Sequence, residues 1–132
     1  MKGPIPTAER KFLYAVDDST RSKKGLDILL KLVRPKDTLA LVHFYSRDSD
    51  LEYLEGLKTY FESELNSVGP VSATYQAIEE EVGVAITSTI ANYSNQYNPD
   101  FFVIAPRATI TISTVSVYVV NHVSASVIFV KV

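Results

Sequence analysis

Three stretches of the chain are apolar on both sides of an extended backbone, and they constrain the fold more than any other feature. They span residues 11–16, 101–105 and 126–132. Strands of this kind are typical of a parallel sheet whose two faces are covered by helices. Ligands of such sheets bind at the carboxyl ends of the strands. Asp17 and the residues after Ala105 are therefore expected to lie at the functional edge.

The segments between these strands alternate between helical and extended patterns. Apolar residues between 26 and 33 recur at i, i+3, i+4 and i+7, which predicts a helix. Ser19 or Thr20 can cap this helix, and Arg34-Pro35 ends it. The remaining patterns predict, in chain order, a strand at 38–45, a helix at 48–66, a polar edge strand at 71–78 and a helix at 84–97.

Residues 109–120 present a conflict between local propensity and topology. They are rich in β-branched side chains, which favours a strand. The alternation changes phase between Ile112 and Val115, however, and a parallel crossover between the last two strands requires a helix. We therefore expect a helix at 113–122 whose poor propensity is overridden by burial. The predicted fold class is α/β, with a five-stranded parallel sheet in the order βαβαβαβαβ.

Length and composition restrict the functional classes. The 132 residues predict one domain at 11–132 after an irregular lead-in at 1–10 that contains two prolines. The formal net charge of -2 argues against a nucleic acid partner. The absence of Cys and the presence of two His argue against disulfides, thiolate chemistry and a metal site. Because no signal-type segment and no long apolar run is visible, a cytoplasmic protein without a membrane partner is expected.

Four short motifs occur in a recognisable order. Leu-Tyr-Ala-Val-Asp-Asp-Ser stands at 13–19, Leu-Val-His-Phe at 41–44 and Pro-Asp-Phe-Phe-Val-Ile at 99–104, and a helical stretch at 116–122 leads into the final strand. Together they resemble the universal stress protein family. The resemblance implies a three-layer, Rossmann-like α/β/α architecture of the adenine nucleotide alpha hydrolase type. It also implies a dimer, since many members dimerise through the last strand.

The resemblance directs attention to the segment after the fourth strand, where ATP-binding members carry a Gly-x2-Gly-x9-Gly-Ser/Thr loop. Glycines there let the backbone approach the phosphates, which N–H groups of the next helix bind. In this chain Ala105 and Ala108 correspond to the two leading glycines. The closing pair corresponds to Ser113-Thr114, after four residues where nine are expected. The two added methyl groups and the shorter loop predict that ATP is not bound in the family's manner.

Other positions of the candidate nucleotide site are less decisive. Phe44 follows the histidine of the second strand where the family has valine, and its ring could fill the space of an adenine. Asp17 is retained and by resemblance would contact the nucleoside, but a strand-end carboxylate that binds nearby loop amides has equal weight. Arg107 could hold an anion or be a solvated loop residue, and Thr114 is interpreted as a helix cap. His43, in an apolar strand, is interpreted as a core histidine with satisfied hydrogen bonds.

Three functions are compatible with these residues. The first is a non-enzymatic universal-stress-type domain that has lost ATP binding, has no cofactor and acts as a dimeric protein in the stress response or in protein interaction. The second is a sensor that holds ATP, another adenine nucleotide or a small anion through Asp17, Arg107 and Thr114. The third is a receiver-like phosphoacceptor domain, suggested by Asp17-Asp18, although Ile78 is followed by Glu rather than Asp. No nucleophile–base pair is evident, so no enzymatic activity is expected.

The last strand predicts the dimer contact. Residues 126–132 are almost wholly apolar, with Lys131 as their one charge, and are expected at a sheet edge. An exposed apolar edge invites pairing with another chain, and two copies related by a two-fold axis can pair antiparallel. Val127, Phe129 and Val130 are the predicted interface residues. The sequence identifies no protein partner beyond a second copy.

Overall fold

The chain folds around one parallel β-sheet that is covered by helices on both sides. The computed structural model describes residues 9–68, 72–106 and 114–132. In chain order the elements are β1 (Lys11–Ala15), α1 (Thr20–Leu32), β2 (Thr38–Tyr45), α2 (Leu51–Val68), β3 (Ser72–Glu79), α3 (Ile86–Tyr97), β4 (Phe101–Ile104), α4 (Thr114–His122) and β5 (Ser126–Phe129).

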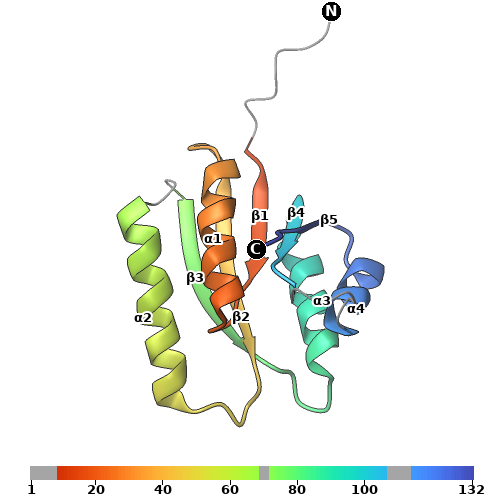
Figure 1. Ribbon diagram of the computed structural model, residues 1–132. Helices are drawn as coiled ribbons and strands as arrows, with labels where there is room; N and C mark the ends of the chain where they lie inside the picture. Colours follow the sequence, from red (N-terminus) through yellow and green to blue (C-terminus); the bar gives the residue numbers. More distant parts are fainter. Residues whose placement is uncertain (1–8, 69–71, 107–113) are drawn as a thin grey trace, which may run out of the picture.

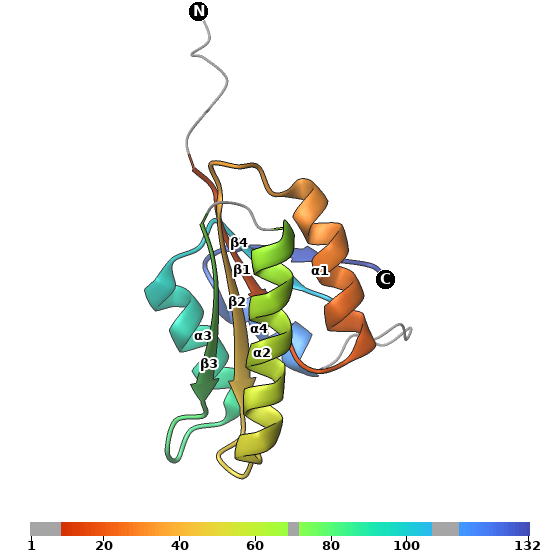
Figure 2. The same ribbon diagram turned by 90° about the vertical axis from the view of Figure 1, so that its left-hand side faces the viewer.

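The sheet order is β3-β2-β1-β4-β5, and each neighbouring pair is parallel. Helices α1 and α2 lie on one side of the sheet, and α3 and α4 lie on the other (Figures 1 and 2). The predicted α/β class, the alternating element order and the edge position of β3 are therefore confirmed. The carboxyl ends of all five strands point to the same edge, because every strand runs in the same direction.

Strand alternation divides the apolar side chains between two cores. Tyr14 and Phe61, both without exposed surface, belong to the core beneath α1 and α2. Leu13, Val42 and Phe102 belong to the core beneath α3 and α4. Successive residues of β1 therefore point into opposite cores, which is why this strand is apolar on both faces. Within the described residues, no helix has the length and hydropathy that crossing a membrane would need.

Helix α4 resolves the conflict at residues 109–120. The described part of this stretch is helical from Thr114 onward, and β5 pairs parallel with β4. The chain can reach a parallel neighbour only through a crossover, and Val119 is completely buried within it. Tertiary contacts therefore override the β-propensity of these residues. The last strand is shorter than predicted, although Val130 N still donates to Ile104 O at 2.8 Å.

Candidate functional site

The turn after β1 places Asp17 at the carboxyl edge of the sheet and ties it to the start of α1. Asp17 Oδ1 accepts hydrogen bonds from Ser19 N and Ser22 Oγ, each at 2.9 Å. The Ser22 hydroxyl also accepts from Asp17 N at 3.0 Å, and the Ser19 side chain caps α1 by accepting from Ser22 N at 3.1 Å. Burial raises the pKa of Asp17, but these hydrogen bonds and Arg21 outweigh burial and hold that pKa below its usual value.

Asp17 is therefore an ionised carboxylate that is bound within its own turn. The prediction that it contacts nearby loop amides is confirmed, and so is the capping role of Ser19. Both hydrogen bonds that the Asp17 carboxylate accepts in this turn use Oδ1, and Oδ2 takes part in neither. Contact with a nucleoside stays a prediction, and Oδ2 is the atom that would make it.

Tyr14 fills the space between β1 and the first turns of α1, a contact that the sequence analysis missed. Its buried hydroxyl donates to Ser22 O at 2.8 Å. A methyl group at Gly25 would overlap this hydroxyl and would lie 3.1 Å from the Ala105 methyl. Burial and the charge of Asp17 raise the pKa of Tyr14, so the phenol stays neutral. A glycine inside an amphipathic helix was the sequence signal for such close packing.

Phe44 lies on the side of the sheet that alternation predicts, but its ring packs against a helix. It shares the α3–α4 core with Val42, whereas His43 points to the opposite side and contacts Tyr53 of α2. The Phe44 ring meets the Tyr93 ring of α3 edge to face, with centroids 5.6 Å apart. Phe44 is only partly buried in this position. That its ring takes the place of an adenine stays a prediction.

The description of His43 as a satisfied core histidine needs correction. The side chain is in the core, with 4% of its surface exposed. Its Nδ1 atom, however, is buried and has no hydrogen-bond partner among the residues that the structure describes. The reason is that β2 directs the ring toward aromatic neighbours, Tyr45 and Tyr53, rather than toward a backbone acceptor. Such an unpaired buried polar atom is uncommon in folded proteins.

No family model and no curated protein matches this sequence. Solved structures match its fold. UspA from Lactobacillus plantarum has a TM-score of 0.76 at 14% identity, over 94% of this chain and 99% of that one. A universal stress protein family protein from Arabidopsis thaliana with AMP bound has 0.70 at 21%, over 92% and 91%. The Archaeoglobus fulgidus universal stress protein in complex with dAMP has 0.73 at 18%, over 92% and 98%.

The chain has the universal stress protein fold. This finding agrees with the resemblance of its four sequence motifs, which cover the same elements from β1 to β5. It concerns the backbone, because the identities are low, and it leaves ligand and activity open.

The loop after β4, where the resemblance places the phosphate-binding residues, lies largely outside the described residues. Arg107, Ala108 and Ser113 lie there, so the predictions made for them are not tested. Thr114 begins α4 in the backbone trace, and its side chain is not described. Ala105 is described, and it packs with the α1–α2 core beside Gly25.

The three predicted interface residues of β5 differ in exposure. Phe129 is 43% exposed and Val127 is half-buried at the edge of the sheet. Val130 is 4% exposed and packs in the α1–α2 core, so its side chain has almost no surface to offer a second copy. That these three residues form a dimer contact stays a prediction.

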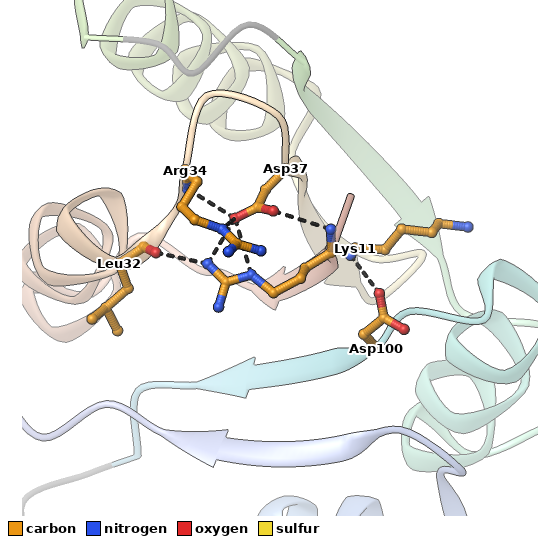
Figure 3. A network of polar contacts seen from close by, with 6 residues as sticks. Lys11, Leu32, Arg34, Asp37 and Asp100 are labelled. Carbon is orange, nitrogen blue, oxygen red and sulfur yellow. Dashed lines mark hydrogen bonds and ion pairs between the residues drawn. The ribbon is translucent and has the colours of Figure 1, made fainter. Parts of the chain in front are cut away.

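A second polar cluster, also missed from sequence, lies at the opposite edge of the sheet, where the strands begin (Figure 3). Asp37 is completely buried, and its Oδ1 accepts from Arg10 N at 3.0 Å. Its Oδ2 accepts from Arg10 Nη2 and Arg34 N, both at 2.8 Å, and from Arg10 Nε at 3.2 Å. Burial raises the pKa of Asp37, but these donors hold it well below its usual range. Both oxygens are engaged, so this cluster joins segments of the chain rather than binding a ligand.

Proposed function

We propose that this protein is a non-enzymatic, dimeric domain of the universal stress type that does not bind ATP. The observation that carries the proposal is the packing at the start of α1, at the carboxyl edge of β1. There the protein's own groups, the Tyr14 phenol and the Ala105 methyl, occupy the space beside Gly25, and Asp17 Oδ1 is engaged in its own turn. Asp17, the residue that by resemblance would contact a nucleoside, therefore already serves its own turn through Oδ1.

The hydroxyl groups of this corner favour a structural role over catalysis. Ser22 is 4% exposed, and its hydroxyl both accepts from Asp17 N and donates to Asp17 Oδ1. A nucleophilic serine needs an accessible hydroxyl paired with a base. The Ser19 hydroxyl is used by the helix cap. Because both hydroxyls are used in hydrogen bonds within the fold, they support the proposal of a non-enzymatic domain that acts through binding.

A nucleotide sensor is the second candidate. Proteins of this fold have been solved with AMP and with dAMP, which have fewer phosphates than ATP. Asp17 Oδ2 remains outside the hydrogen bonds of its turn, and it could accept from a nucleoside. Under this alternative a monophosphate would bind without the long glycine loop that a triphosphate requires.

Isothermal titration of the protein with Mg-ATP and, separately, with AMP is the direct test. We expect no saturable heat with ATP, because the loop after β4 lacks the family's glycines. A dissociation constant for ATP in the low micromolar range, equivalent to about -8 kcal/mol, would contradict the proposal. Saturable binding of AMP alone that is lost in Asp17→Asn would favour the sensor instead.

Dimer formation through β5 is tested by sedimentation equilibrium at tens of micromolar protein. The wild type is expected to be a dimer, because β5 is an edge strand that exposes Phe129. Phe129→Asp should shift the protein to monomer, since it places a charge where the two strands would meet.

Val120→Asp is the matched control for this experiment. Val120 is 47% exposed, close to the 43% of Phe129, but it lies on α4 rather than on β5. We expect the control to remain dimeric. A wild-type monomer would refute the proposed dimer, and a dimer that Val120→Asp disrupts while Phe129→Asp does not would assign the interface to α4.

A further inference from the structure

The imidazole ring of His43 is buried and lies beside two aromatic rings. The Tyr45 and Tyr53 rings have centroids 6.0 and 5.9 Å from the imidazole centroid. Nδ1 is buried, and no group within residues 9–68, 72–106 and 114–132 forms a hydrogen bond with it. A neutral imidazole tolerates this position at a modest cost, whereas an imidazolium would bury a charged N–H donor without an acceptor.

Charged and titratable groups approach His43 from two neighbouring segments. Asp17 and Asp18, in the turn after β1, attract its proton, and Tyr53 approaches from α2. On β2 itself the nearest titratable group is Tyr45, and the register partner on β3 is the uncharged Ala77. Arg21 of α1 acts on Asp17. Burial lowers the pKa of His43 by more than the two carboxylates raise it.

Tyr53 covers the His43 ring from a turn of α2 that is itself exposed. Tyr53 lies in the first turn of α2 and is itself 37% exposed, and Leu51 at the start of that turn is 72% exposed. A helix end that is as exposed as this one opens at low free-energy cost. The carboxylates that favour a protonated imidazole, Asp17 and Asp18, lie in the turn after β1, and Asp18 also interacts with the Tyr53 hydroxyl.

We propose that His43 makes the carboxyl edge of this sheet acid-sensitive. When His43 is protonated, its ring moves out of the core toward Asp17 and Asp18. This movement displaces Tyr53, and the first turn of α2 loosens. The neutral ring keeps the edge closed, and the charged ring favours an open edge at the site where ligands of this fold class bind. This proposal goes beyond the proposed function and does not depend on whether a nucleotide binds.

The direction in which pH changes the stability of the closed edge follows from proton linkage. An unfolded or opened chain binds a proton at His43 near pH 6.5, whereas the closed state binds it only at lower pH. Where the open state holds more protons, stability rises with pH. Stability of the closed edge is therefore complete above about pH 7 and is lost as the pH falls through the ordinary histidine range.

NMR titration of the wild-type protein tests the proposal without any substitution. The chain has two histidines, so the imidazole spectrum contains two sets of signals, and His122 is exposed. We expect the His43 ring to titrate below 6.5, with backbone amides of residues 17–18 and 51–54 shifting at the same midpoint. A His43 midpoint at or above 6.5, or amides that do not follow it, would overturn the proposal.

Urea unfolding of matched variants at pH 7 and pH 5 provides the second test. The urea concentration at the unfolding midpoint of the wild type should be lower at pH 5 than at pH 7. In His43→Leu most of this decrease should disappear. His122→Leu should keep it, because the His122 ring is exposed in the folded chain. An undiminished fall in His43→Leu would refute the mechanism, and if that variant does not fold, the wild-type titration decides alone.

Discussion

Replacing Asp37 with alanine is expected to lower the free energy of unfolding at pH 7 by about 3 kcal/mol. The carboxylate is completely buried and accepts hydrogen bonds from two backbone N–H groups, those of Arg10 and Arg34, as well as from the Arg10 guanidinium. Its removal would leave these donors without their acceptor at the point where α1 returns to the sheet. Urea unfolding followed by circular dichroism measures the change.

Arg34→Ala is the control for this prediction. The Arg34 side chain is 45% exposed, and its Nε lies 3.6 Å from Asp37 Oδ2, so its loss should cost less than about 1 kcal/mol. The backbone N–H that donates to Asp37 is retained in this variant. Equal losses in the two variants, or a loss below about 1 kcal/mol in Asp37→Ala, would contradict the assigned role of the carboxylate.

The contribution of Asp37 should also depend on pH. Its pKa in the folded state lies below that of an unfolded Asp, which is about 3.9. The stabilisation is therefore complete above that value and is lost as the pH falls toward the folded pKa. The stability difference between wild type and Asp37→Ala is expected to be constant from about pH 5 to 7 and to narrow below about pH 4.

Substitution of Gly25 by alanine is expected to destabilise the protein by about 2 kcal/mol, although alanine is the better helix former. The added methyl would overlap the Tyr14 hydroxyl and lie 3.2 Å from Tyr14 Cζ. Neither ring nor helix can move freely, because Tyr14 is fully buried and its hydroxyl is bonded to Ser22 O. Chemical denaturation measures the loss.

Gly56 supplies the matched control, because it is the glycine of α2 and nothing lies within 4 Å of the methyl it would gain. Gly56→Ala should therefore stabilise the protein by up to about 1 kcal/mol. In a double-mutant cycle, Tyr14→Phe should reduce the cost of Gly25→Ala, because it removes the overlapping hydroxyl. Additive effects of the two substitutions would show that the strain lies elsewhere.

Much of the architecture could be predicted because it depends on periodicity. Residues apolar on both faces identified β1, β4 and β5 as strands of a helix-covered parallel sheet, and the weaker pattern of β3 identified an edge strand, as the sheet order confirms. The Ser19 cap was predictable because capping involves residues three positions apart. Element ends were less accurate: α2 begins at Leu51 rather than 48, because helix ends depend on local competition among caps.

The candidate site was predictable in position but only partly in its contacts. Topology alone puts Asp17 at the carboxyl edge of β1. That its carboxylate serves its own turn depends on the Ser22 hydroxyl, five residues away on the next helix. Likewise, the alternation of β2 placed His43 opposite Phe44, but the contact of its ring with Tyr53 depends on another element, α2.

Local chemistry therefore determined the α/β class, the parallel sheet and the position of the candidate site at its carboxyl edge, since strand and helix periodicities and capping act over a few residues. Only the tertiary structure decided the contacts across elements. Tyr14 against Gly25, Arg10 with Asp37 over 27 positions and the buried face of α4 all join segments that folding brings together. In α4 this burial outweighs β-propensity, because propensity amounts to at most about 1 kcal/mol per residue, whereas burying one large aliphatic side chain contributes about 1.5–3 kcal/mol.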